Sequence, residues 1–366
     1  MGLQVGIVGL PNVGKSTLFN AVSTTAKAEA ANYPFCTIEP NVGIVPVPDD
    51  RFDALVRLYK PVKEVRATID FVDIAGLVRG ASKGEGRGNA FLSNIREVDA
   101  IAHVVRCFED EQVIHVSNKV DPLDDVSTIE AELILKDLDG VDRALDKARK
   151  QARAGKPEDK VAVDALEIVR AKLDQGTPAN AIVLSDDHRK IVRNLFLLTD
   201  KPTFFVANVA EADLHGAGGP HVQKLEAFAK TRGMRVVRIS AAIESEIAAL
   251  PKSEQGEFLA SLDLKEPGLH GVVRAGYELL DLITFFTAGD PEVHAWTIAR
   301  GTKAPQAAGK IHTDFERGFI KAEVIHWKDL VELGSESAAR SAGKLAIEGK
   351  DYVMRDGDVV HFRFNV

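Results

Sequence analysis

The stretch GLPNVGKST, residues 9–17, follows an apolar run at residues 5–8 and precedes apolar residues at helical spacing from Leu18 to Val22. This order predicts a strand, a glycine-rich loop and the start of a helix. Glycines let consecutive backbone N–H groups point inward at phosphate oxygens, and the helix N-terminus adds partial positive charge. The stretch therefore predicts a phosphate-binding P-loop in an α/β domain with a mostly parallel sheet.

The side chains of this loop have separate predicted roles. Lys15 is expected to reach the β- and γ-phosphates of a nucleotide, and the Ser16 hydroxyl is expected to bind Mg²⁺. A chance glycine turn is the alternative, but it would not explain why every fixed position of the motif is matched between a strand and a helix. The other nucleotide-binding positions expected in the loop are Asn12, Val13, Gly14 and Thr17.

A second stretch, TIDFVDIAG at residues 68–76, predicts a strand that ends in Asp-x-x-Gly. Asp73 then has the position from which such enzymes hold magnesium, usually through water. Between the two motifs, residues 32–40 form a proline-bounded loop with Thr37 placed to complete the magnesium shell. A surface threonine is the alternative for Thr37. Together the two stretches predict a magnesium site beside the P-loop.

Two loops compete for the role of reading the base. Residues 118–121 spell NKVD, the pattern of a guanine-reading loop. They follow the apolar run at residues 101–105 too closely to leave room for a crossover helix and another strand. The run at residues 201–207 is a better buried strand, so the base-reading loop is predicted at residues 208–211, and residues 118–121 are a look-alike.

The predicted base-reading loop departs from the guanine pattern. It begins with Asn208, but Val209 replaces the lysine whose stem packs on the base, and Glu211 replaces the aspartate that accepts hydrogen bonds from guanine. Ser240, after the next predicted strand, supplies the companion loop. Guanine recognition is therefore compromised, and a site without a dedicated carboxylate is expected to discriminate only modestly between bases.

Two longer stretches carry a specific family resemblance. One is DIAGLVRGASKGEGRGNAFLSNIR at residues 73–96, and the other covers residues 295–316. They resemble the glycine-rich second switch and the C-terminal segment of the YchF group of Obg-like ATPases, and the resemblance extends from the first strand to Val366. It implies a preference for ATP over GTP, with Asn208 contacting the exocyclic amine of adenine and Val209 contacting the base through its main chain.

Catalysis needs a residue that positions water. Ras-like switches use a glutamine directly after Asp-x-x-Gly, but Leu77 stands there, so hydrolysis is expected to be slow without help. The resemblance implies His115 as the catalytic partner of Lys15, and a solvated loop histidine is the alternative. Asn118 stands where the family usually has glycine. Asn12 matches an asparagine that ligates K⁺ in related enzymes, so potassium stimulation is a hypothesis beside the expected Mg²⁺.

Hydrophobic spacing indicates the domain organisation. Apolar residues at alternating intervals of four and three predict a coiled-coil hairpin with its turn at residues 155–157. Arms of roughly 30 residues would be about 45 Å long. After a helix near residues 272–280, the C-terminal part resembles a TGS domain of β-grasp type, with strands at residues 282–286, 293–298 and 359–364. We expect a discontinuous G domain at residues 1–118 and 200–278, a helical insertion at 119–199 and the TGS domain at 281–364.

Basic side chains gather toward the predicted hairpin tip. A solvated helix face is one explanation for them, and contact with an RNA phosphate backbone, ribosomal by resemblance, is the other. These residues are Arg143, Lys147, Arg149, Lys150, Arg153, Lys156 and Lys160.

The bulk composition excludes several classes of protein. The 366 residues are 45% hydrophobic and 27% charged, with two cysteines, and no apolar run reaches the roughly 18 residues of a membrane span. No basic leader precedes the first strand, so we expect a cytoplasmic protein. We also expect a monomer without membrane contact. The net charge of −8 argues against coating nucleic acid with the whole surface, and no DNA specificity is expected.

The expected function is that of a slow, magnesium-dependent ATPase that works as a molecular switch on ribosomes, in translation or stress response. Two other functions remain open. A GTP-specific enzyme of ribosome assembly would bind the same phosphates through a different base contact. A non-hydrolysing ribosome adaptor would use the nucleotide only as a stabilising ligand.

Overall fold

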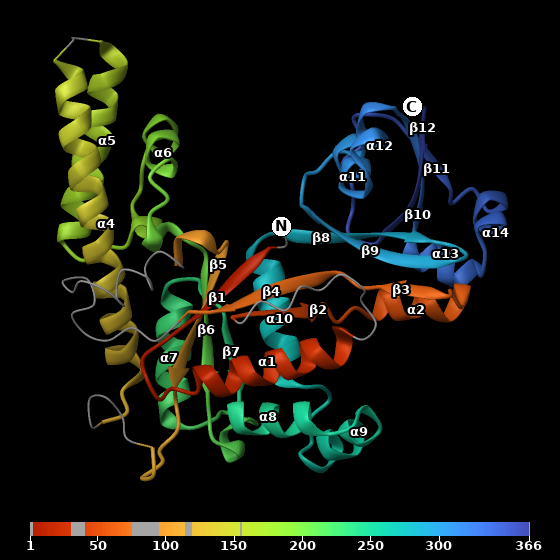
Figure 1. Ribbon diagram of the computed structural model, residues 1–366, viewed down its shortest axis with the longest axis horizontal. Helices are drawn as coiled ribbons and strands as arrows, with labels where there is room; N and C mark the ends of the chain where they lie inside the picture. Colours follow the sequence, from red (N-terminus) through yellow and green to blue (C-terminus); the bar gives the residue numbers. More distant parts are fainter. Residues whose placement is uncertain (1–2, 31–40, 75–94, 114–118, 154–155, 366) are drawn as a thin grey trace.

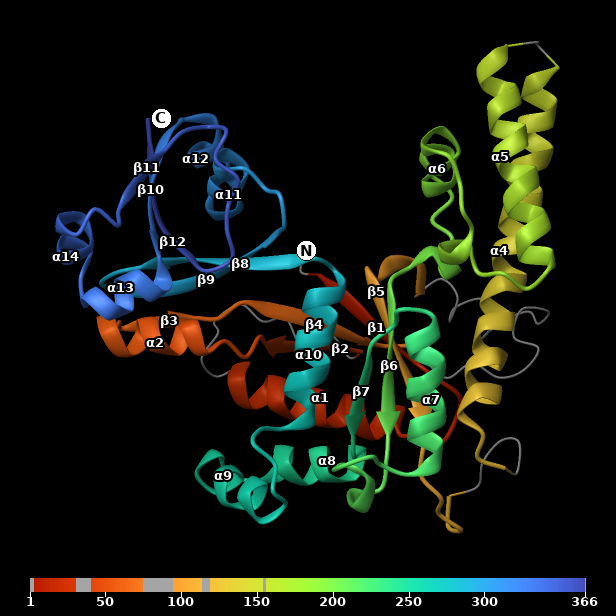
Figure 2. The same ribbon diagram turned by 180° about the vertical axis from the view of Figure 1, so that it is seen from behind.

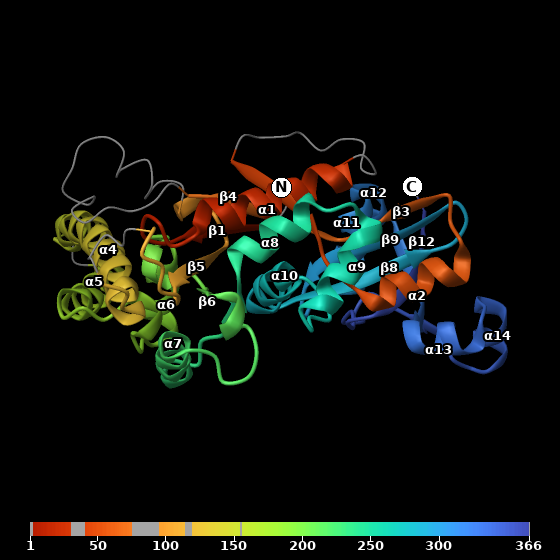
Figure 3. The ribbon, with the colours of Figure 1, turned by 90° about the horizontal axis from the view of Figure 1, so that it is seen from below.

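The computed structural model describes residues 3–30, 41–74, 95–113, 119–153 and 156–365, with only the backbone of residues 26–30. Figure 1 shows an α/β body, a long helical hairpin at one end of it and a smaller C-terminal sheet domain at the other. Seen from below, the hairpin and the C-terminal domain lie at opposite ends of the molecule (Figure 3). The expected fold class is confirmed by this architecture.

The central sheet has the strand order β2-β4-β1-β5-β6-β7. Neighbouring strands are parallel except for β2, which is antiparallel to β4. All seven residues of β5 are buried, as expected for a strand covered on both faces. The strands are β1 (Gln4–Val8), β2 (Val42–Pro46), β4 (Thr68–Asp73), β5 (Ala100–Arg106), β6 (Thr203–Asn208) and β7 (Val236–Ile239).

Helices cover both faces of this sheet. Phe204 and Val206 of β6 belong to the core that includes α10, whereas Phe205 and Ala207 belong to the core that includes α7, because successive strand residues point to opposite faces. The helices of the body are α1 (Lys15–Ala30), α7 (Pro220–Thr231), α8 (Ala241–Ala249), α9 (Lys252–Ser261) and α10 (Gly268–Leu279), with the short turn η3 (Glu211–Asp213).

The predicted coiled-coil hairpin is present, with unequal arms. Helix α4 (Pro122–Ala152) has 31 residues, but α5 (Pro157–Asp174) has only 18, so the second arm is shorter than expected. Apolar residues of the two arms form one buried cluster, which includes Val141, Leu145 and Val169. The chain returns through η1 (Ala179–Ala181), α6 (Asp186–Arg193) and η2 (Leu198–Asp200).

The insertion leaves the sheet order undisturbed, because β5 and β6 pair directly, with Ile101 opposite Thr203. Its return segment is tied to α4 by Asp137, whose carboxylate is fully buried. Asp137 accepts hydrogen bonds from Leu198 N at 2.8 Å, Thr199 N at 2.8 Å and Thr199 Oγ1 at 2.7 Å. Burial raises the pKa of this carboxyl above its usual value, and the hydrogen bonds oppose that shift.

The first helix of the hairpin also packs on the body: in Figure 2 the lower part of α4 runs beside α7.

The C-terminal sheet has the order β11-β10-β12-β8-β9-β3. The three strands predicted from the sequence are found, but β10 and β11 were missed. The strands are β8 (Leu282–Ala288), β9 (Glu292–Ala299), β10 (Phe319–His326), β11 (Ala346–Glu348), β12 (Asp358–Phe364) and β3 (Lys63–Val65). The helices of this part are α11 (Ala304–Ile311), α12 (Thr313–Arg317), α13 (Trp327–Leu333) and α14 (Glu336–Ser341).

One strand of this sheet comes from the N-terminal half of the chain. β3 runs parallel to β9, with Lys63 opposite Glu292, and the preceding helix α2 (Asp50–Tyr59) packs on the same domain. The expected boundaries, with all of residues 1–118 in the G domain, stay a prediction, but residues 50–65 are packed with the C-terminal sheet. Within the described ranges, no helix is long and apolar enough to cross a membrane.

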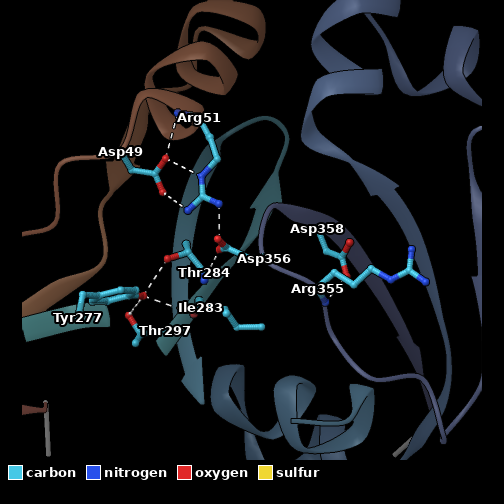
Figure 4. A network of polar contacts seen from close by, with 9 residues as sticks. All are labelled: Asp49, Arg51, Tyr277, Ile283, Thr284, Thr297, Arg355, Asp356 and Asp358. Atoms are coloured by element: carbon cyan, nitrogen blue, oxygen red, sulfur yellow. Dashed lines mark hydrogen bonds and ion pairs between the residues drawn. The ribbon is translucent and has the colours of Figure 1, made fainter. Parts of the chain in front are cut away.

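A polar network fastens the two sheet domains together (Figure 4). Arg51 donates to both carboxylate oxygens of Asp49 at 2.8 Å and pairs with Asp356 at 2.8 Å, while Asp356 accepts from Thr284 N at 3.0 Å. The Tyr277 hydroxyl of α10 lies 2.7 Å from Thr284 Oγ1 of β8. The C-terminal domain is therefore held against the end of α10 and the start of α2.

Candidate nucleotide-binding site

The P-loop lies between β1 and α1, and its backbone geometry explains its glycines. Gly14 has φ of +96° and Asn12 has φ of 61°, both in the left-handed region that glycine and asparagine tolerate best. A Cβ on Gly14 would lie 2.2 Å from Asn208 Nδ2, and a Cβ on Gly9 would lie 2.5 Å from the carbonyl oxygen of Val104. The loop therefore packs against β5 and β6 at a distance that only glycine permits.

Asn208, the last residue of β6, joins three loops. Its side chain is 4% exposed, and Nδ2 donates to the carbonyl of Val13 at 2.9 Å. Its Oδ1 accepts from the backbone N–H of Ala241, at the start of α8, at 2.9 Å. The structure thus brings together the P-loop, the loop after β6 and the loop that contains Ser240, three segments that are far apart in the sequence.

The three other residues expected to bind the base, Val209, Glu211 and Ser240, differ in exposure. The Val209 side chain is 2% exposed and lies in the core under α7, and its N–H donates to Ile239 O at 2.8 Å. The expected main-chain contact of Val209 with a base is therefore limited to its carbonyl group. Glu211 is exposed at the start of η3, and Ser240 is buried directly before α8.

The look-alike aspartate has other partners. Asp121 is the N-cap of α4, where its carboxylate accepts from Leu123 N at 3.1 Å. Lys224 of α7 donates to both carboxylate oxygens at 2.8 and 2.9 Å. The hydrogen bond from Lys224 is the main reason why the pKa of Asp121 lies below its usual value. These contacts account for Asp121 as a helix cap, whereas Asn208 is bonded to the P-loop.

Lys15 and Asp73 are the charged groups at the phosphate end. Lys15 is 7% exposed, and its Nζ donates to the carbonyl of Leu10 at 2.6 Å. Burial lowers the pKa of Lys15 to about 8, against the opposing effect of Asp73. Burial raises the pKa of Asp73, against the opposing effect of Lys15. Each charge therefore partly offsets the desolvation of the other.

Comparisons with known proteins show which family this chain belongs to. A family model described as "50S ribosome-binding GTPase" matches residues 4–139, and the YchF-GTPase_C model, described as a protein of unknown function, matches residues 282–365. The "Ribosome-binding ATPase YchF" of Haemophilus influenzae is 53% identical over 366 residues, which cover 100% of both chains. The chain belongs to the YchF family.

Two other YchF relatives are similar to this chain over nearly its whole length. The "Ribosome-binding ATPase YchF" of Bacillus subtilis is 52% identical over 370 residues, again covering 100% of both chains. The solved "Structure of the Schizosaccharomyces pombe YchF GTPase" is similar with a TM-score of 0.89 and 40% identity, covering 99% of this chain and 98% of that chain. The names of these relatives agree on the YchF family but differ between ATPase and GTPase.

The oxygen donors present fit a magnesium ion. Ser16 is exposed in the first turn of α1, and Asp73 ends β4 close enough to Lys15 to affect its pKa. Hydroxyl and carboxylate oxygens are the hard ligands that Mg²⁺ prefers beside phosphate oxygens. The third expected ligand, Thr37, and the expected catalytic His115 lie outside the described residues, as does Asn118.

Arg106, at the end of β5, was not singled out by the sequence analysis, although it orders the loop after this strand. It is 1% exposed, and its guanidinium donates to the carbonyls of Phe108 at 3.1 Å, Asp110 at 3.2 Å and Val113 at 2.8 Å. Through these three contacts, Arg106 holds the main chain of the loop that follows β5. In the sequence this loop continues toward His115. The available signal was an arginine at the end of a strand that is otherwise apolar except for His103.

Proposed function

We propose that the protein hydrolyses ATP, and GTP less well, as a magnesium-dependent molecular switch that binds ribosomes. The observation that carries this proposal is the anchoring of Asn208 to the P-loop, followed by Val209 and Glu211 instead of a guanine-reading lysine and aspartate. The bacterial relatives are named ribosome-binding ATPases, which supports the same function.

The base preference follows from the hydrogen-bonding capacity that Asn208 has left. Val13 takes one of its two Nδ2 hydrogens and Ala241 occupies one lone pair of Oδ1, so one donor and one acceptor position remain. The acceptor suits the exocyclic amine of adenine. A guanine site needs in addition a carboxylate for the ring N–H and the 2-amino group, and the aspartate of the look-alike motif is bonded to Lys224.

The phosphate chemistry rests on residues of the P-loop. On binding, Lys15 would exchange its contact with the Leu10 carbonyl for phosphate oxygens, and the first N–H groups of α1 would donate to the same phosphates. Bound Mg²⁺ would supply further positive charge, with Ser16, Thr37 and Asp73 as its proposed ligands. His115 is the proposed residue for positioning water, and because Leu77 cannot take that role, the intrinsic rate should be low.

Ribosome binding is proposed to involve the hairpin. The basic residues predicted near its tip are exposed, as contact with an RNA backbone requires. Arg149 forms an ion pair with Glu167 at 2.7 Å, so this cation is already neutralised within the hairpin. The proposal therefore depends more on Lys147, Lys150 and Lys156.

Competition between nucleotides tests the base preference. ATP and GTP would be titrated, each with Mg²⁺, against one fluorescent nucleotide, and ATP should displace it at the lower concentration. Displacement by GTP at a concentration orders of magnitude below that of ATP would refute the adenine assignment and favour guanine nucleotides, in line with the GTPase names of one solved relative and one family model.

Phosphate release tests whether the protein is an enzyme. Steady-state release should exceed the background set by Lys15→Ala, and His115→Ala should lower it without weakening ATP binding. Release equal to the Lys15→Ala background, with or without ribosomes, would leave only the non-hydrolysing adaptor. Potassium stimulation through Asn12 stays a hypothesis, and equal rates in sodium and potassium salts would remove it.

A further inference from the structure

A cavity of about 480 Å³ lies between the G domain and the base of the helical insertion. Its walls come from β5, β6, α4, the end of α7, and the turns η1 and η2. The residues Ile101 and Thr203 that line it stand at the amino-terminal ends of β5 and β6, at the sheet edge opposite to Asn208 and the P-loop. Cavities of roughly 300–1,000 Å³ are typical of small-molecule sites.

The lining is mostly apolar, with its charges paired. The buried side chains of Ile129 and Leu133 of α4 and Phe205 of β6 line the cavity, and Leu198 of η2 lines it from the insertion. The charged lining residues are Glu130 of α4 and Arg232 at the end of α7, and these two form an ion pair with each other. A ligand of this cavity would therefore gain most from an uncharged, apolar body.

One buried nitrogen of the wall lacks a partner. His103 of β5 lines the cavity and is 3% exposed, and its Nε2 has no hydrogen-bond partner among the residues that the structure describes. Its ring packs on Phe205 with centroids 5.6 Å apart. Leaving such a buried nitrogen unpaired is unfavourable, so unpaired groups of this kind are rare and call for an explanation. In a neutral imidazole Nε2 either donates or accepts, and a hydroxyl group satisfies both cases.

We propose that this cavity binds a small uncharged molecule with an aromatic or aliphatic body and a hydroxyl group that hydrogen-bonds to His103 Nε2. The cavity is distinct from the nucleotide site but not electrostatically isolated from it, because burial and then the charge of Lys15 lower the pKa of His103. Because its walls belong to both the G domain and the insertion, a bound molecule would stabilise the present placement of the hairpin on the body. That link between a small ligand and the hairpin follows from the positions of α4, η1 and η2 in the wall.

Phenol and toluene are matched probes for this proposal, because they share a ring and differ by the hydroxyl group. Each would be titrated into the full chain with ¹⁵N-labelled histidine while the ring nitrogens of His103 are followed by NMR. Phenol should bind saturably, shift the Nε2 resonance, and bind about ten-fold more tightly than toluene, as one hydrogen bond to a buried group allows.

Two variants locate the binding. His103→Phe keeps a ring of similar size but removes the nitrogen, so phenol should lose its advantage over toluene while both probes still bind. Ile129→Trp should fill the cavity and abolish binding of both. A cooperative thermal unfolding transition like that of the native chain serves as the check that each variant is folded, and if Ile129→Trp fails it, Leu133→Phe takes its place.

Three results would overturn the proposal. The first is that neither probe binds saturably, and the second is that phenol and toluene bind equally well to the native chain. The third is a crystal structure with phenol in which an ordered water stays on His103 Nε2, which would make the cavity a hydration site.

Discussion

Replacing Asn208 by alanine tests how the nucleotide site is assembled. The change removes the donor to the Val13 carbonyl and the acceptor for the Ala241 N–H, and all three residues are at most 4% exposed. Losing a hydrogen bond and leaving its buried partner unpaired costs roughly 1–2 kcal/mol for each of the two bonds, or about 2–4 kcal/mol together. The P-loop and the start of α8 should lose the hydrogen bonds that connect them through Asn208.

Two measurements report this loss. Hydrogen exchange of the Ala241 amide should become faster, because its acceptor is gone. ATP affinity should fall by about 30-fold or more, since the free energy needed to bring the loops back together is taken from binding at 1.4 kcal/mol per factor of ten. Tryptophan fluorescence is a poor probe here, because Trp296 and Trp327 both lie in the C-terminal domain.

Asp121→Ala is the matched control. It removes a helix cap and the pairing with Lys224, which should reduce the stability of α4 by about 1 kcal/mol. ATP affinity should stay within about two-fold of the native value, because Asp121 makes no contact with the P-loop. Unchanged ATP binding by Asn208→Ala together with weak binding by Asp121→Ala would refute the assignment of the base-reading loop.

Four further predictions follow from the structure. Burial lowers the pKa of Lys15 to about 8, and bound phosphates should raise it again. At a pH just above that value, the ATP complex should therefore hold more protons than the free protein. ATP binding should then take up protons and weaken as the pH rises further, which calorimetry in two buffers of different ionisation heat measures; zero uptake would contradict it. Asp137→Asn should speed hydrogen exchange of the backbone amides at residues 198–199, because a side-chain amide cannot accept at both former carboxylate oxygens. The stability of the protein should fall by about 1–3 kcal/mol. Unchanged exchange would show that the carboxylate does not hold the return segment. Arg51→Met should lower the unfolding free energy of the C-terminal domain, detected by fluorescence, by less than about 1 kcal/mol, because the ion pair with Asp356 is partly exposed. A loss well above about 2 kcal/mol would mean that the network is more strongly coupled than the contacts indicate. Arg106→Lys should lower kcat while leaving the KM for ATP nearly unchanged, because its contacts hold the loop after β5 and not the nucleotide; a changed KM with normal kcat would argue against this.

Local patterns were sufficient for the elements whose residues lie next to one another in the chain. The P-loop, the strand that ends at Asp73 and the two arms of the hairpin were predicted because glycine spacing and hydrophobic period are local properties. The second arm was overestimated: α5 ends at Asp174, shortly before Gly176 and Pro178, and α6 is a separate helix. β10 was missed because burial along residues 319–326 does not alternate regularly: the register shifts between Phe319 and Lys321, and Val324 and Ile325 are both buried.

Contacts between distant residues could not be read in the same way. The sequence excluded Asp121 only by the length of chain available, whereas the fold gives that carboxylate its actual partners on α4 and α7. The pairing of β3 with β9, across more than half the chain, leaves no local signal, because a short exposed strand has neither a period nor a buried face.

Chain chemistry alone therefore establishes which groups can hold phosphate: a glycine loop, a lysine and a hydroxyl at a helix start are defined by neighbours in sequence. Tertiary packing decides which asparagine stands beside them, where Arg106 directs its donors, and that His103 faces a cavity between two domains. The reason is physical: hydrogen bonds and burial depend on separation in space, and only the folded chain brings Asn208 to within 2.9 Å of Val13.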